Sequence, residues 1–338
     1  MELYCGIDLH SNNSVIVILN EIDKVIYQKK LDNDLTLILK QLAVYKNNIT
    51  AIAIESTFNW YWLVDGLIEA GYTVKLVNTA AVQTYSGLKH TDDKDDARWL
   101  AHLMRLKILP TGFIYPKKER AVRDLLRKRS QLVRQSTTNI LSLQNILARN
   151  TAQSLSSYKI KKLDDEQADK LIKDPNITLS LKSNLNIIRC LQSTISDIED
   201  AVLQQVRIRQ EFKKLLTVSG IGEILGLTIM LESGDMNRFP KVGNFSSYCR
   251  CVKSERFSNG KKKGEGNRKN GNKYLAWAFI EAANFAVRYN DKIKAFYQKK
   301  KAKTNGIIAI KAVANKLARA CYHILKDQVS FDVNKAFA

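Results

Sequence analysis

The sequence predicts an α/β domain followed by mainly helical regions, a fold class of α/β plus α. Short apolar runs alternate with helical patterns at the start of the chain. A long three/four alternation of apolar residues follows, and the last part combines helical patterns with a glycine turn and a basic stretch. We therefore expect an α/β domain at 1–115, a coiled-coil helical region at 116–212 and a mainly helical domain at 213–338.

The first region begins with three strand patterns, LYCGIDLHSN, SVIVILNE and KVIYQKKLD, the first two separated by a polar Ser-Asn-Asn turn. LTLILKQLAVYK has helical spacing, whereas ITAIAIES is a short β-branched and alanine run suited to a buried central strand. FNWYWLVDGLIEAGY predicts a helix closed by Gly71, TVKLVN another strand, and ARWLAHLMRLKIL a last helix. Three strands followed by helix, strand, helix, strand and helix is the order of ribonuclease-H-like folds.

The middle region contains two long amphipathic helical patterns. The first has apolar residues at positions 122, 125, 132, 140, 143 and 147, and the second at Leu181, Leu185, Ile188, Ile195, Ile198, Val202 and Val206. DDEQADKLIKDPNIT between them predicts a polar connection broken by Pro175. The two helices pair as a coiled coil, either as a hairpin within the chain or as an oligomerisation arm.

The third region contains two features suited to phosphate binding. Between two helical patterns lies a turn, Ser219-Gly220-Ile221-Gly222, that is typical of a helix-hairpin-helix, and Gly220 and Gly222 would offer backbone N–H groups to a phosphate. Such a short motif also fits an ordinary tight turn. The stretch CVKSERFSNGKKKGEGNRKNGNKY predicts a flexible phosphate-gripping loop, with the basic residues Lys253, Arg256, Lys261, Lys262, Lys263, Arg268, Lys269 and Lys273. Helices follow at YLAWAFIEAANFAVRY and at 306–326.

The composition favours a nucleic-acid partner. The chain has 54 Lys plus Arg against 33 Asp plus Glu, a net charge of +21, which points to nucleic acid first and an anionic membrane surface second. It has no apolar run of membrane-spanning length, and its N-terminus lacks a signal-peptide pattern. The five cysteines include no CxxC pair and predict reduced thiols rather than disulfides or zinc. We expect a cytoplasmic protein without a membrane partner.

Carboxylates lie at the predicted strand ends. Asp8 ends the first strand pattern, Glu55 ends the buried strand, and HTDDKDDARWL begins the last helix with Asp92, Asp93, Asp95 and Asp96. Each alone fits a turn, a helix-cap neighbour or a partner of the helix dipole. Together they converge in a ribonuclease-H-like sheet, where their repulsion costs several kcal/mol unless cations are bound. Oxygen ligands of this kind select Mg²⁺ or Mn²⁺, and two such ions can assist phosphoryl transfer.

At this point the motifs resemble a known family. GIDLH, IESTFNWYWLVDGLIEAGYTVKLVN and KHTDDKDDARWLAHLMRLKIL are similar to the N-terminal, RuvC-like DEDD domain of the IS110 family of insertion-sequence transposases. The stretch from TVSGIGEILGLTIMLESGDMNRF to KNGNKYLAWAFIEAA is similar to the family's second signature domain. The resemblance covers nearly the whole chain.

The resemblance implies particular site residues. The family's four acids carry over to Asp8, Glu55, Asp93 and Asp96, because an alanine follows the second acid of the pair, and Asp92 with Asp95 is the competing frame. The family's serine nucleophile carries over to Ser258 in Phe257-Ser258-Asn259-Gly260. The usual Gly-Leu-Val-Pro before it is replaced by Arg-Cys-Val-Lys, and one serine of the usual pair is missing, which makes Ser254 a second choice.

The resemblance also implies an activity and partners. It implies a DNA recombinase that cuts a strand through a phosphoserine link, uses Mg²⁺ or Mn²⁺, and exchanges strands through a junction. A structured bridge RNA would pair with donor and target DNA, and the protein would assemble as a homodimer or homotetramer in a bacterial cytoplasm, at the nucleoid when acting. The alternatives are a RuvC-type Holliday-junction nuclease with water as nucleophile, and a non-catalytic nucleic-acid scaffold.

Overall fold

The computed structural model describes residues 1–82, 93–206, 209–265 and 270–338. The chain forms two compact units, Met1–Lys117 and Lys118–Ala338, and each is described by itself.

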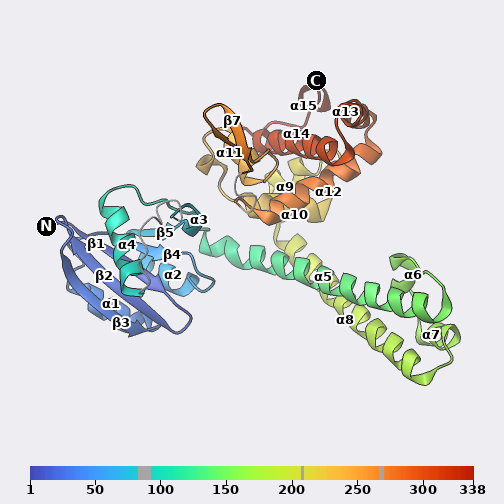
Figure 1. Cartoon of the computed structure of the whole chain (residues 1–338), viewed down its shortest axis with the longest axis horizontal. Helices are drawn as coiled ribbons and strands as arrows, with labels where there is room; N and C mark the ends of the chain where they lie inside the picture. Colours follow the sequence, from blue (N-terminus) through green and yellow to red (C-terminus); the bar gives the residue numbers. More distant parts are fainter. Residues whose placement is uncertain (83–92, 207–208, 266–269) are drawn as a thin grey trace. The chain divides into compact units, whose positions relative to one another are not determined.

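The first unit is built on a five-stranded sheet with the order β3-β2-β1-β4-β5 (Figure 1). Its strands are β1 (Leu3–Leu9), β2 (Asn13–Asn20), β3 (Val25–Asp32), β4 (Ile49–Glu55) and β5 (Val74–Val77). The first three form an antiparallel meander, whereas β4 and β5 run parallel to β1. The helices between them are α1 (Leu35–Ala43), α2 (Tyr61–Glu69), α3 (Thr79–Val82) and α4 (Asp93–Arg105). This mixed sheet and the order of its elements agree with the predicted ribonuclease-H-like fold.

The two faces of the sheet are covered by different helices. Alternate residues of β1 and β2 point to opposite faces, and on one face Ile7 and Ile16 pack with the apolar sides of α1 and α2. On the other face Val15 and Val17 pack with Ala97 and Ala101 of α4. Every residue of β1 is buried, which is why this strand reads as a continuous apolar run.

The helix α4 lies directly on the backbone of β1. A Cβ at Gly6 would lie 2.0 Å from the carbonyl oxygen of Ala97 and 2.9 Å from the amide nitrogen of Ala101. At the other end of α4, Asp23 in the β2–β3 turn accepts from Arg105 Nε at 3.0 Å and lies 2.7 Å from His102 Nδ1. These contacts fix α4 across the sheet and so determine where its first turn lies.

The second unit contains a helical hairpin formed by α5 (Lys117–Thr151) and α8 (Pro175–Val206). Leu143 and Leu147 of α5 share an apolar cluster with Leu181 and Leu185 of α8, so the two helices pair within the chain. The predicted polar connection contains two short helices, α6 (Ser157–Lys161) and α7 (Asp165–Leu171). The helix α7 begins with a capping box of Asp164 and Gln167.

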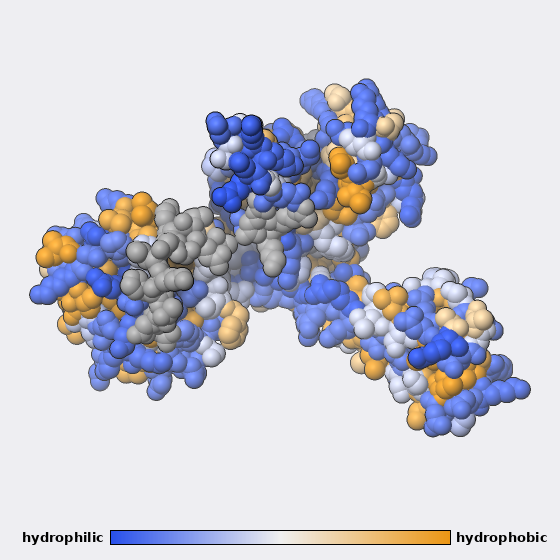
Figure 2. Space-filling view, in the orientation of Figure 1, coloured by the Kyte–Doolittle hydropathy of each residue, from blue (hydrophilic) through white to orange (hydrophobic). Residues whose placement is uncertain are grey.

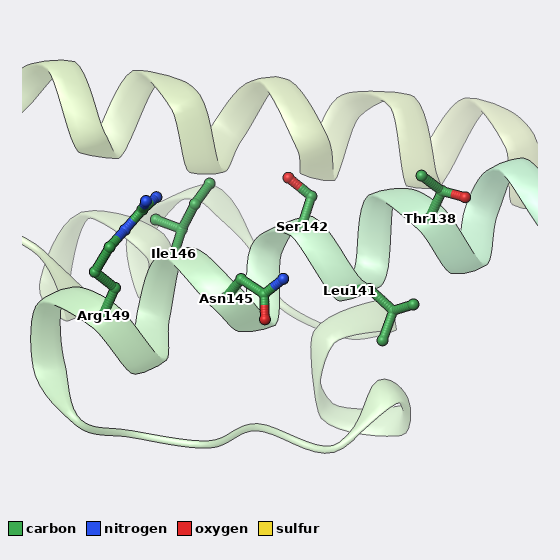
Figure 3. Close-up of a pocket in the computed structure, with 6 residues that line it drawn as sticks. All are labelled: Thr138, Leu141, Ser142, Asn145, Ile146 and Arg149. Carbon is green, nitrogen blue, oxygen red and sulfur yellow. The ribbon is translucent and has the colours of Figure 1, made fainter.

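A shallow hollow of about 480 Å³ lies on α5 near the end of this hairpin. Figure 3 shows its six lining residues, all from α5, with Leu141 pointing away from α8. Leu141 is 53% exposed. No partner chain is present, so the oligomerisation arm stays a prediction.

The rest of the second unit packs helices around one apolar core. Its helices are α9 (Gln210–Leu215), α10 (Glu223–Ser233), η2 (Met236–Arg238), α11 (Val242–Tyr248), α12 (Lys273–Tyr289), α13 (Asp291–Lys303), α14 (Gly306–Lys326) and α15 (Val333–Ala336). The turn between α9 and α10 carries the predicted glycine motif. No helix among the described residues is long and apolar enough to span a membrane.

Part of the predicted flexible loop is a β-hairpin made by β6 (Arg256–Ser258) and β7 (Lys261–Gly264). Asn259 and Gly260 have φ values of 50° and 69°, so both turn residues are left-handed. A two-residue Asn-Gly turn of this kind matches the twist of an antiparallel hairpin. The prediction of a flexible loop was therefore wrong for these residues. The Asn-Gly pair favours a hairpin, and this preference outweighs the opposite preference of the surrounding lysines and glycines.

Candidate active site

The parallel pairing of β1 and β4 brings two of the predicted acids together. The register pairs Ile7 with Ile54, so Asp8 and Glu55 occupy the next positions on neighbouring strands. Asp8 is only 3% exposed, whereas Glu55 is half-buried. Two carboxylates at one sheet edge, one of them buried, form a site that a cation would stabilise.

The electrostatics of Asp8 reflect this crowding. Burial, and then a hydrogen bond with Glu55, raises the pKa of the Asp8 carboxyl to about 7. His10 opposes the shift, since its Nε2 lies 3.0 Å from Asp8 Oδ2, while the charges of Glu55 and Asp96 add to it. The Asp8 carboxyl is therefore partly protonated near neutral pH in the metal-free protein.

The helix α4 supplies the remaining acids. Asp93 is its first residue, but its side chain and all of Asp92 lie outside the described residues. Asp95 is half-buried, and Asp96 is exposed but close enough for its charge to raise the pKa of Asp8. This proximity is consistent with Asp96 in the chosen frame, and the choice of Asp93 stays a prediction.

The carboxylates fit a divalent metal by their chemistry. Asp8, Glu55 and Asp96 are hard oxygen donors, and the raised pKa of Asp8 marks a shortage of positive charge at this edge. Among the side chains that the structure describes, no group of three or more acids, histidines or cysteines is close enough to hold an ion. The four-acid set with Asp93 is therefore a prediction.

The predicted nucleophile lies in the second unit. Ser258 is the last residue of β6, pairs with Lys261 across the turn, and is exposed. Ser254, the second choice, precedes the hairpin and is half-buried. An exposed hydroxyl beside a tight turn is accessible to a large substrate, which favours Ser258 on geometric grounds.

Most of the predicted basic residues surround this serine. The side chains of Lys253, Arg256, Lys261, Lys262, Lys263 and Lys273 are exposed, and Arg268 and Lys269 lie outside the described residues. Lys262 Nζ lies 3.0 Å from Glu255 Oε1, and this hydrogen bond lowers the pKa of the Glu255 carboxyl. Figure 2 shows hydrophilic residues over the area that Figure 1 labels β7. The hairpin presents a polar, mostly basic surface around the hydroxyl.

The two glycines of the predicted helix-hairpin-helix differ in their surroundings. Gly220 has a φ of +86°, and a Cβ there would lie 2.3 Å from the carbonyl oxygen of Ala282 in α12. Close packing against α12 explains why position 220 is a glycine. Gly222 precedes α10, and a Cβ there would meet no heavy atom within 4 Å. A role in phosphate contact stays a prediction for both.

A buried polar cluster at the base of the basic segment escaped the sequence interpretation. Glu232 of α10 is 2% exposed and accepts from Arg127 Nε of α5 at 2.5 Å and from Asn272 Nδ2 at 2.7 Å. Asn272 also caps α12, and Arg250 donates to the carbonyl oxygen of Gly271 at 2.9 Å. The two ends of the segment that carries Ser258 are thereby held together. A carboxylate within the apolar run EILGLTIMLES was the available signal.

Four of the five cysteines are buried. All five are free, and Cys5, Cys249, Cys251 and Cys321 are buried. Burial raises the pKa of the Cys251 thiol to about 12, so it is protonated and unreactive at neutral pH.

The fold and its acidic sheet edge, joined to a basic helical unit, define a class of nucleic-acid enzymes that act by phosphoryl transfer. A DEDD transposase model of IS110 type matches residues 5–150, and a model described as transposase of the IS116/IS110/IS902 family matches residues 212–298. The chain belongs to the IS110 family of insertion-sequence transposases. It is a DNA transposase/recombinase, and its DEDD domain implies dependence on a divalent metal. A search of the curated proteins finds no match.

Proposed function

We propose that this transposase cuts DNA with Ser258 as the nucleophile, assisted by Mg²⁺ or Mn²⁺ at Asp8, Glu55, Asp93 and Asp96. The observation that carries the proposal is the pair Asp8 and Glu55, hydrogen-bonded at neighbouring strand ends with a raised pKa at Asp8. A metal bound there would polarise the phosphate and offset the charge of the acids.

The chain's own groups have separate tasks in this proposal. The Ser258 hydroxyl attacks phosphorus and loses its proton, the new Oγ–P bond forms, and a deoxyribose oxygen leaves as a hydroxyl. Asp8 holds a proton for part of the time near neutral pH in the metal-free protein, and a bound metal would displace it. The lysines of the hairpin hold the DNA backbone on either side of the reacting phosphate.

We further propose that a structured bridge RNA selects the donor and target DNA while the protein holds backbones. Support comes from the exposed basic residues of the hairpin segment, which can hold nucleic-acid backbones by phosphate contacts that carry no sequence information. Base pairing would then carry the sequence choice, as in other RNA-guided systems. We also propose assembly as a homodimer or homotetramer.

A covalent-adduct assay tests the nucleophile. The full chain, a labelled donor DNA, its bridge RNA and Mn²⁺ are mixed, and protein–DNA adducts that survive denaturation are resolved on a gel. Ser258→Ala should abolish the adduct and strand cutting, whereas Ser254→Ala, the matched control four residues earlier, should retain both.

The same assay separates the alternatives. Strand cutting by Ser258→Ala without an adduct would favour a RuvC-type nuclease that uses water. If wild type and Asp8→Ala both fail to cut DNA and both fail to bind metal, the result would favour a nucleic-acid scaffold. An adduct lost in Ser254→Ala but kept in Ser258→Ala would move the nucleophile to the second choice.

A further inference from the structure

The turn between α9 and α10 is fixed against the C-terminal half of α12. A Cβ at Gly220 would lie 2.3 Å from the carbonyl oxygen of Ala282 and 2.6 Å from the amide nitrogen of Ala286. Farther along, Asn290 Nδ2 donates to Ser219 Oγ at 3.0 Å. The start of α10 is thereby held beside the last turns of α12.

A hollow of about 520 Å³ opens beside this contact. Residues 220–225 line one side of it, and Phe285 and Tyr289 of α12 line the other. Phe285 is 41% exposed and Tyr289 is 73% exposed. Their rings are parallel within 8°, with centroids 6.5 Å apart. Two neighbouring exposed aromatic rings that border one hollow form an apolar surface on which a ligand can stack.

A basic side chain near the hollow and an acidic side chain in its lining have opposite effects on an anionic ligand. The Arg288 guanidinium lies 6.0 Å from the Tyr289 ring centroid. The N-cap residue of α10 is Gly222, which has no side chain to cap the first turn, and this turn borders the hollow. Glu223 also lines it and would repel a phosphate at that terminus. The inference that this hollow binds a ligand therefore rests on the two aromatic rings and not on the N-terminus of α10.

Two kinds of occupant expose faces that could stack on these rings: another protein surface and an unpaired nucleobase. At this hollow the net charge of +21 favours the nucleobase of a polyanion over a second copy of this chain, and the proposed assembly would then use other surfaces. Nucleic acid is attracted by the same charge. Duplex DNA keeps its base faces inside the stack, whereas a single strand presents them to aromatic side chains.

We propose that this hollow binds an unpaired nucleotide of single-stranded nucleic acid, with its base on Phe285 and Tyr289 and its phosphate near Arg288. The site rests on the proposed function in one respect, namely that the protein handles nucleic acid. It lies on α12, away from the hairpin of Ser258, and adds to the transposase a contact for strands that have been opened or left unpaired. DNA and RNA share this chemistry.

Fluorescence anisotropy with the full chain tests the site. The probes are a labelled oligothymidylate, a labelled oligouridylate of equal length and a duplex of that length. Phe285→Ala and Tyr289→Ala should each weaken single-strand binding about 5- to 150-fold, the range expected for loss of one stacked base, and leave duplex binding unchanged. Tyr289→Phe should restore the affinity. The two single strands show whether DNA or RNA is bound more tightly.

Tyr158→Ala is the matched control. Tyr158 is 67% exposed, lies on α6, and has Lys162 Nζ 4.5 Å from its ring centroid. It is thus an exposed aromatic beside a cation but away from the hollow, and its removal should leave single-strand affinity unchanged. Circular dichroism of each variant checks that the helices are retained.

Three outcomes would overturn the proposal. Unchanged single-strand affinity in both alanine variants would remove the site. A change in oligomeric state by light scattering, without a change in affinity, would make the hollow an interface between copies. Wild-type protein that binds duplex but no single strand would overturn this site and leave the proposed function intact, whereas failure to bind any nucleic acid would contradict the proposed function itself.

Discussion

At the scale of single residues, two buried carboxylates show how a structural acid differs from a functional one. Glu232 is buried against the guanidinium of Arg127, so its charge is compensated by a protein cation. Asp8 is buried beside Glu55, another acid, and its pKa is raised as a result. A buried carboxylate without full compensation is stabilised by a proton or by a bound cation, and this contrast is why we propose Asp8 as a metal ligand.

The raised pKa of Asp8 predicts how metal-free stability depends on pH. In the unfolded chain this carboxyl titrates near 3.8, and in the folded chain near 7. Between these values the folded state holds a proton that the unfolded state has lost, so the free energy of unfolding falls as pH rises from about 4 to 7. Above about 7 this contribution levels off.

Asp8→Asn should remove this pH dependence and should make the metal-free protein more stable than wild type at pH values above 7. Three of the four tryptophans, Trp60, Trp62 and Trp99, lie in the first unit, so urea unfolding followed by tryptophan fluorescence reports mainly on it. Mn²⁺ should stabilise the wild type but not the variant. If the free energy of unfolding changes with pH by the same slope in both proteins, Asp8 does not cause the pH dependence.

Breaking the pair of Glu232 and Arg127 should be costly for the second unit. Glu232→Gln removes the buried anion of this pair and should lower the free energy of unfolding by about 1–3 kcal/mol, measured by urea titration with circular dichroism. Asp169→Asn is the control, because Asp169 pairs with Lys182 at 2.7 Å on the exposed surface. It should cost less than about 1 kcal/mol. Similar losses in both variants would contradict the distinction between the buried and the exposed pair.

At the scale of elements, the position of α4 determines whether its acids reach the sheet edge. The helix approaches β1 at Gly6 and is held at its far end by Asp23, which contacts Arg105 and His102. Neither contact requires a carboxylate of the site. The geometry of the acids therefore depends on residues that take no part in metal binding.

Gly6→Ala should displace α4 from the sheet. The added methyl group would lie 2.0 Å from the carbonyl oxygen of Ala97, a backbone atom that must move with its helix. We expect a loss of about 1–3 kcal/mol in the stability of the first unit, together with weaker Mn²⁺ binding by calorimetry. Gly243→Ala is the control, because a Cβ there meets no heavy atom within 4 Å. Normal Mn²⁺ affinity in Gly6→Ala would show that α4 can shift without disturbing the acids.

At the scale of the whole molecule, the net charge of +21 is spread over many exposed lysines. Total charge sets the general attraction for nucleic acid, whereas the residues in contact with phosphates set how strongly that affinity depends on salt. The hairpin of β6 and β7 and the helix α13 each carry a run of three lysines. Variants of these two lysine runs therefore separate the effect of local phosphate contacts on the salt dependence from the effect of general charge.

Replacing Lys261, Lys262 and Lys263 together with Gln should reduce the slope of log affinity against log salt for duplex DNA by about 2–3, because each phosphate contact contributes about 0.9. Anisotropy over a range of salt concentrations measures this slope. Replacing Lys299, Lys300 and Lys301 of α13 with Gln removes the same charge and should change the slope less. Equal slopes in the two triple variants would indicate general attraction and no specific grip by the hairpin.

The sequence by itself determined the order of strands and helices and the positions of Asp8 and Glu55 at strand ends. These follow from hydrophobic periodicity, which depends only on near neighbours in the chain. The Asn259-Gly260 hairpin was also encoded locally, although the lysines and glycines around it favoured the interpretation as a loop. The family motifs then identified the transposase.

Only the tertiary structure decided what surrounds each of these residues. The pKa of Asp8 is raised by burial and by the neighbouring Glu55. Position 220 requires a glycine because the backbone of α12 leaves no room for a Cβ there. Glu232 pairs with a cation in α5 that is 105 positions away in the sequence. The hollow beside Phe285 likewise joins segments about 60 residues apart. Burial, charge compensation and cavities depend on contacts between distant segments, and no local pattern in the sequence records them.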